Sequence, residues 1–154
     1  IFLLVGLTLA AVFLYPSKPE IEIKSMRIVG IGWDDGILID LPTSLHIEMD
    51  LTVINDNVMG AVIDKVKGKA YLSDNDDPQE NDFIGDFSVE KPFEVPGNGK
   101  VDITVDFYLR DLPSPVKTAK IIDSETIFLR TAGNVYLSLS FFDFSIPFDE
   151  TERI

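Results

Sequence analysis

Apolar and polar residues alternate along most of the chain after residue 19. The pattern is clearest over residues 44–53, where every odd position is apolar and every even position is polar. Residues 101–109 and 135–141 alternate in the same way. A period of two is typical of a β-strand with one buried and one solvated face, because successive side chains point to opposite sides. These three stretches therefore predict strands of an antiparallel sheet.

The alternation changes phase at Phe141-Phe142, and the apolar set then continues at even positions to Phe148. Such a change predicts a β-bulge or a strand that bends between two sheets. Weaker alternation predicts further strands over residues 20–28, 37–41, 62–72, 83–95 and 126–130. Tight turns are expected at Asp35-Gly36, Asn98-Gly99 and Gly133-Asn134, because these residue types accept positive φ.

One helix is expected, at residues 116–122. Ser114 is a favoured N-cap residue, and Pro115 is favoured at the first helical position. Around eight strands with a single late helix predict an all-β fold. We expect an antiparallel β-sandwich over residues 20–148, followed by a C-terminal tail at residues 149–154.

Residues 1–15 carry no charge, and all charged residues and the one His follow them. Fifteen helical residues reach only about 22 Å, short of the roughly 30 Å hydrocarbon core of a bilayer. We expect a single N-terminal transmembrane helix that begins before the given sequence, joined to the domain by a stiff linker at residues 16–19. The alternative is the apolar core of a secretory signal peptide, with small residues at Ala10 and Ala11.

Composition excludes several functions. The chain has 26 acidic and 13 basic residues and a net charge of −13, which repels phosphate backbones and argues against nucleic-acid binding. The absence of cysteine excludes disulfides, thiolate metal sites and cysteine nucleophiles, and no cofactor is expected. Crowded carboxylates are expected to have raised pKa values, which predicts stability at pH 5 at least equal to that at pH 7.5.

Polar side chains offer two candidate sites, each with a plainer explanation. Ser44, His46, Glu48 and Asp50 have the residue types of a hydrolase, but side chains on one strand face run parallel and do not converge. We therefore expect a solvated sheet face and no enzyme. An acidic loop offers Ca²⁺ ligands but lacks the frame of a calcium-binding loop, so a solvated loop is the default. Its carboxylates are Asp74, Asp76, Asp77, Glu80 and Asp82.

Phenylalanine is concentrated near the C-terminus, on both sides of the phase change. Both faces of that segment cannot be buried in one two-layer core, so a helix, a partner chain or a ligand must cover one of them. We expect an apolar crevice between the sheets, although dense core packing is the alternative. The predicted ligand-binding residues are Val105, Phe107, Phe141, Phe142 and Phe144.

Several segments follow a recognisable order along residues 19–148. They are Pro19-Glu-Ile-Glu-Ile, residues 45–54 with Asn55-Asp56-Asn57, residues 62–72, Ile84-Gly85, Pro92-Phe93-Glu94-Val95-Pro96-Gly97, residues 101–109 and Phe144-Ser145-Ile146-Pro147. This order resembles the second subgroup of late embryogenesis abundant proteins, also called the water-stress and hypersensitive-response domain. Asp56 departs from the family, which has proline there, and it removes the fixed φ of that turn.

The resemblance implies a fibronectin-III/immunoglobulin-like sandwich on a single-pass anchor, with the C-terminal domain in a lumenal, vacuolar or extracellular space. It also implies an association with stress or defence and, in some relatives, with lipid. The leading prediction is a non-enzymatic, membrane-anchored domain that binds lipid or another apolar ligand. The alternative is a structural module that forms homo-oligomers through an exposed Phe-rich face and edge strands.

Overall fold

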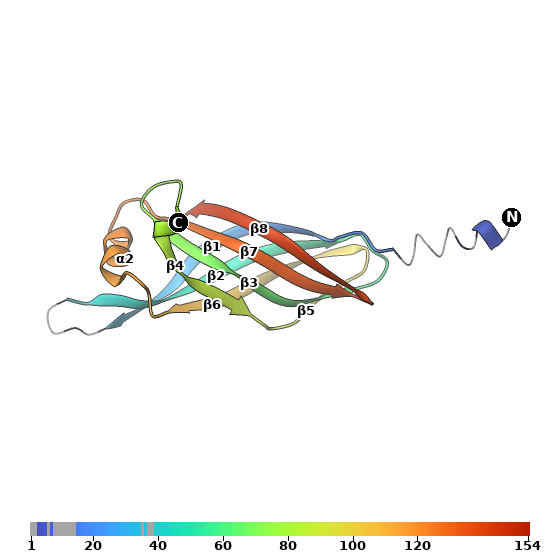
Figure 1. Ribbon diagram of the computed structural model, residues 1–154, viewed down its shortest axis with the longest axis horizontal. Helices are drawn as coiled ribbons and strands as arrows, with labels where there is room; N and C mark the ends of the chain where they lie inside the picture. The colour runs from blue at the N-terminus through green and yellow to red at the C-terminus, as the bar shows by residue number, and fades with distance from the viewer. Residues whose placement is uncertain (1–2, 6, 8–14, 35, 37–38) are drawn as a thin grey trace.

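Two antiparallel β-sheets pack against each other in a computed structural model that describes residues 3–5, 7, 15–34, 36 and 39–154 (Figure 1). The smaller sheet has the strand order β1-β2-β6. Its strands are β1 (Glu20–Asp34), β2 (Leu41–Asn55) and β6 (Gly99–Arg110). The first two pair from Glu20 opposite Ile54, so the linker enters beside the end of β2.

The larger sheet has the order β4-β3-β7-β8, and the short β5 also pairs with β3. Its strands are β3 (Ala61–Ser73), β4 (Phe83–Val89), β5 (Phe93–Val95), β7 (Phe128–Leu139) and β8 (Phe142–Arg153). A 3-10 turn, η1 (Glu80–Asp82), precedes β4, and the helix α2 (Pro115–Ile122) follows β6. The helix begins after Ser114 with proline in its first turn, as the sequence predicts.

The core lies between the two sheets and follows from the alternation. In β2 the odd residues 45–53 are at most 1% exposed, and they face the buried side chains of β3 and β7. The opposing core residues include Ile63, Leu72, Leu129, Val135 and Leu137. Because both inner faces are apolar and interdigitate, the predicted two-sheet sandwich is confirmed.

The phase change at Phe141-Phe142 is a hairpin turn and not the predicted bulge or bend. Leu139 pairs with Phe142, and Ser140 adopts a φ of 55° in the two-residue connection. A two-residue turn reverses the chain and shifts the parity of the apolar set as a bulge would, so the two are hard to distinguish in sequence. The predicted turn at Gly133-Asn134 is wrong, because both residues lie inside β7.

Other boundaries also differ from the sequence prediction. Residues 83–95 form two strands separated at residues 90–92, and β8 continues through most of the expected tail at 149–154. Asn98 has the expected positive φ of 47°, yet it links β5 to β6 in the other sheet and makes no hairpin. Residues 35, 37 and 38 lie outside the described part, so the Asp35-Gly36 turn and the start of strand 37–41 cannot be placed; β2 begins at Leu41.

The predicted transmembrane helix needs a correction. In the described residues, no helix is long and apolar enough to cross a membrane. Residues 3–5 and 7 are helical, while residues 1–2, 6 and 8–14 of the predicted span lie outside the described part. The predicted single-pass membrane protein with an extracytoplasmic domain is therefore overturned.

Candidate functional site

The five residues predicted to bind an apolar ligand do not line one crevice. Val105 and Phe107 are buried in the core, and the Phe107 ring stacks on Phe87 with 4.0 Å between ring centroids. Phe144 is half-buried against the same core. Phe141, in contrast, is 98% exposed, and Phe142 is 38% exposed. The predicted set thus divides into core residues and residues of an exposed turn.

The exposed members belong to an apolar tip at the end of the sandwich where the N-terminal segment joins (Figure 1). Three connections form it: the linker, the β2–β3 turn and the β7–β8 turn. The apolar tip consists of Tyr15, Val58, Met59, Phe141 and Phe142. Tyr15 holds it together, because its ring lies 6.2 Å from the Phe142 ring and it lines a pocket with Val58 and Met59.

Asn55 builds the frame beneath the apolar tip. Its side chain is fully buried, and its amide nitrogen donates to the carbonyl oxygens of Met59 at 2.8 Å and Pro96 at 3.2 Å. Its Oδ1 accepts the backbone N–H of Asn57 at 3.1 Å. One neutral side chain therefore joins the β2–β3 turn to the segment that precedes β6.

Asn57 fastens the linker to the same frame. Its Oδ1 accepts the backbone N–H of Ser17 at 2.7 Å, and its Nδ2 donates to the carbonyl of Ser17 at 2.8 Å. These two bonds hold Tyr15 and Pro16 beside Val58 and Met59. The Asn-x-Asn turn found in the sequence thus positions the apolar tip, even though Asp56 replaces proline.

Individual contacts of Asp82 and Glu80 fix the acidic loop to the rest of the domain, and its carboxylates do not converge on one point. Asp82 accepts Lys117 Nζ from α2 and the backbone N–H of Gln79, each at 2.8 Å. Burial raises the pKa of Asp82, but these two hydrogen bonds outweigh it and hold the pKa below its ordinary value. Glu80 accepts the Tyr71 hydroxyl at 3.4 Å. Asp74, Asp76 and Asp77 are exposed, and no trio of the predicted Ca²⁺ ligands converges within the described chain.

Pairing of β2 with β6 brings a carboxylate to the single histidine. His46 Nε2 lies 2.8 Å from Asp106 Oδ1, and the His46 ring stacks on Tyr108 with 4.3 Å between centroids. Glu48 lies close to both and forms an ion pair with Arg27. Ser44 is not among the contacts of His46, so the face has no nucleophile and base in hydrogen-bond reach among the described residues.

The same face continues as a closed network around Asp50. This carboxylate accepts hydrogen bonds from Thr104 at 2.7 Å, Arg27 at 2.6 Å and Ser25 at 2.9 Å. The bond from Thr104, followed by that from Arg27, lowers the pKa of Asp50 to about 2. Bonds from Arg130 likewise hold the pKa of Asp149 below its ordinary value. Where the structure displaces a carboxyl pKa, it lowers it, which is opposite to the rise expected from crowding.

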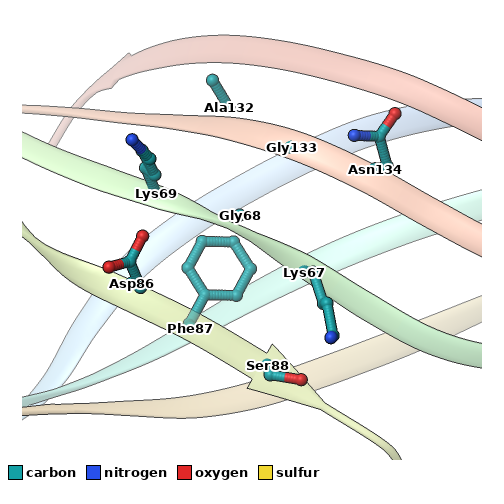
Figure 2. A pocket seen from close by; sticks show the side chains of 9 residues that line it. All are labelled: Lys67, Gly68, Lys69, Asp86, Phe87, Ser88, Ala132, Gly133 and Asn134. Carbon is teal, nitrogen blue, oxygen red and sulfur yellow. The ribbon is translucent and has the colours of Figure 1, made fainter.

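A hollow of about 520 Å³ lies on the outer face of the larger sheet, over β4, β3 and β7. Figure 2 shows its centre over Phe87, Gly68 and Gly133, with longer side chains around it. A Cβ on Gly68 would lie 2.6 Å from the Ala132 carbonyl oxygen, and one on Gly133 would lie 2.5 Å from Gly68 Cα. The close approach of β3 and β7 therefore requires both glycines.

Sequence reasoning missed Tyr15, Val58 and Met59 in the apolar tip and the rim lysines Lys67 and Lys69 of the hollow. Two signals were available. The residues after an Asn-x-Asn turn are expected at the end of a sheet, and lysine at alternate positions 65, 67 and 69 marks one face of a strand.

No family model matches the chain, and no curated protein matches it significantly. Solved structures do. A protein from Arabidopsis thaliana, known from a solution structure, is 11% identical over 91% of this chain and 83% of its own, with a TM-score of 0.60. A protein assigned to the late embryogenesis abundant (LEA) group is 12% identical over 97% of this chain and 77% of its own, with a TM-score of 0.57.

The chain has the fold of a late embryogenesis abundant protein. A protein from Archaeoglobus fulgidus shares this LEA fold, with a TM-score of 0.54 and 14% identity over 86% of this chain and 96% of its own. The resemblance inferred from the sequence is thus confirmed at the level of the fold. None of the three structures is described as an enzyme.

Proposed function

We propose that this LEA-fold domain is non-enzymatic and binds a lipid surface through its apolar tip, in a stress-associated role. The observation that carries the proposal is the exposure of Phe141, 98%, beside four further apolar residues from three separate connections. Transfer of a phenylalanine side chain from water into an apolar phase contributes about 2–3 kcal/mol. A rigid turn that presents such a side chain loses little conformational entropy on binding.

The surroundings of the apolar tip limit the kind of surface it suits. The net charge of −13 disfavours anionic headgroups, so zwitterionic lipid is the better partner. Asp56 lines the same pocket as Tyr15, Val58 and Met59. Because a charge is costly inside hydrocarbon, we expect the apolar tip to reach the boundary between headgroups and acyl chains and no deeper.

Binding to phosphatidylcholine vesicles, measured by co-sedimentation, tests the proposal. Phe141→Asp should weaken the partition of the chain by about tenfold or more, because it replaces apolar burial by a charge. Ile39→Asp is the matched control, since Ile39 is 69% exposed in the β1–β2 connection at the opposite end (Figure 1). Every variant retains residues 1–15, so their contribution to vesicle binding is the same in each. The difference between Phe141→Asp and Ile39→Asp then measures the contribution of the apolar tip.

Equal partition of Phe141→Asp and the unchanged chain, with unchanged thermal unfolding, would contradict lipid binding by the apolar tip. An equal loss with Ile39→Asp would show a non-specific effect of added charge and would also contradict it. Light scattering separates the alternative of self-assembly. A dimer that Phe141→Asp dissociates would assign the apolar tip to a second copy of the chain.

A further inference from the structure

The hollow over β3 combines a flat apolar floor with a polar rim. Its floor is formed by the backbone of Gly68 and Gly133, with the nearly buried ring of Phe87 beneath them and Ala132 at one side. Phe87 is itself fixed from below by its stacking on Phe107. Small-molecule sites in proteins typically enclose about 300–1,000 Å³ and combine apolar walls with a few polar groups. The hollow has a similar volume, about 520 Å³, but it is open to solvent on one side, so a ligand would lie on it with one face exposed.

The rim carries two lysines without a carboxylate partner. Among the described residues, the Lys67 side chain makes no ion pair, hydrogen bond or ring contact, and the Lys69 side chain only lies with its amine 5.8 Å from the centre of the Phe83 ring. Asp86 is opposite Lys69 in the register, yet no ion pair joins them. In the described chain only four of the 13 basic residues form ion pairs, so what distinguishes Lys67 and Lys69 is their position on either side of the hollow.

Neutral donors flank Lys67 on both neighbouring strands. The register places Ser88 and Asn134 opposite Lys67, on β4 and β7. Ser145 donates to Asn134 Oδ1 at 3.3 Å, which orients that amide and leaves its Nδ2 group without an acceptor in the described chain. The Ser88 hydroxyl likewise has no partner among the described residues. The rim is therefore rich in hydrogen-bond donors.

From this geometry we infer that the hollow binds a small planar organic anion, of the class of aromatic carboxylates. The flat ring would lie on the backbone of Gly68 and Gly133, which carry no side chains. Lys67 and Lys69 have four rotatable bonds each, and either amine can swing over the hollow to the carboxylate. Asp86 on the rim disfavours a second acid group, so a monoanion fits better than a dianion. This inference does not depend on the apolar tip.

Titration of the ¹⁵N-labelled full chain with 2-naphthoate, followed by NMR, tests the inference. We expect saturable shifts at the amides of Gly68, Gly133 and Asn134, with a millimolar or tighter dissociation constant. The neutral isostere 2-naphthalenemethanol should bind about tenfold more weakly, because it lacks the charge-assisted bonds. Acetate, which has the charge but no ring, should also bind about tenfold more weakly, because it cannot cover the floor.

Variants assign the site. Lys67→Gln with Lys69→Gln should weaken 2-naphthoate about tenfold, whereas Lys100→Gln, an exposed lysine of β6 on the other sheet, should leave it unchanged. Ala132→Leu should also weaken binding, by filling one side of the hollow. The inference is overturned if naphthoate and its neutral isostere bind equally, if the double lysine variant binds as the unchanged chain does, or if shifts spread over both sheets without saturation.

Discussion

The two ends of the sandwich hold their loops by different means. At the apolar tip the frame is neutral and buried: Asn55 is fully buried, and its amide satisfies the carbonyls of Met59 and Pro96. At the end that carries α2, the frame is ionic and partly exposed. There Lys117 bonds Asp82, and Arg130 donates to the carbonyl of Pro78 at 3.0 Å.

This difference shows what each end can contact. The ionic end keeps charged groups at its surface, with Asp74, Asp76 and Asp77 exposed beside the paired groups. Charges there stay in water, because their transfer into an apolar phase is unfavourable. At the apolar tip the Asn55 amide is paired inside the turn, while the Asn57 bonds to Ser17 lie at the surface. Exposed apolar side chains project beside them, foremost Tyr15, Val58 and Phe141, which suits a lipid surface.

Removal of the neutral frame should have the largest effect. Asn55→Ala removes a fully buried amide and leaves the carbonyl groups of Met59 and Pro96 and the Asn57 N–H without their partners, and it should lower the free energy of unfolding by about 3 kcal/mol. Urea denaturation measures this loss. Asn57→Ala is the matched control, because it removes the exposed bonds to Ser17 and one bond to Asn55 Oδ1 but leaves the Asn55 amide paired, and it should cost about 1 kcal/mol. Similar losses in the two variants would contradict a buried frame at the apolar tip.

The carboxylates of the ionic end should make the melting temperature depend on pH, with a smaller effect than loss of the neutral frame. A carboxyl group with a lowered folded pKa stabilises the fold above its unfolded pKa, and this stabilisation is lost as pH falls through the folded value. At this end Asp82 and Asp149 have lowered pKa values, and on the smaller sheet the pKa of Asp50 falls from 3.8 to about 2. These groups should leave the melting temperature level between pH 7.5 and 5 and decrease it from about pH 4 towards pH 2.

Asp82→Asn isolates the contribution of the ionic end. It removes one charge-assisted bond from Lys117 and should lower the free energy of unfolding at pH 7 by about 1 kcal/mol. The gap between this variant and the unchanged chain should narrow as the pH falls through the lowered folded pKa of Asp82, because protonation then removes the same charge that the substitution removes. A gap that is independent of pH would mean that Asp82 acts through packing and not through its charge.

The sequence predicts the core strands and the helix better than it predicts the connections. Alternation gives the strands of the core, because burial of one face repeats every two residues along β2 and β6. The helix begins with Pro115, as the sequence predicts, whereas the Ser114 side chain makes no capping hydrogen bond. The connections are harder to predict. In the β7–β8 turn the residue with positive φ is Ser140 and not the usual Gly or Asn, and the turn changes the parity of the apolar positions as a bulge would.

The candidate sites depend on pairing between strands, which one sequence does not determine. The sequence identifies Phe141 and Phe142 because both faces of their segment cannot be buried in one core. A crevice that joins them to Val105 and Phe107 requires a bent strand, and the structure has a turn there. Asp106 meets His46 only through the register of β2 with β6. Likewise, Lys67 gains its neighbours Ser88 and Asn134 from β4 and β7, far along the chain.

The most direct test of the central claim places a probe on Phe141. The chain has no cysteine, so Phe141→Cys can be labelled at one position with an environment-sensitive nitrobenzoxadiazole dye. Val116→Cys on α2, at the opposite end and 57% exposed, is the matched control. When phosphatidylcholine vesicles are added, we expect the emission of the dye at position 141 to shift to the blue and gain intensity, while the emission at position 116 stays unchanged. No shift at position 141, or equal shifts at both positions, would contradict lipid binding by the apolar tip.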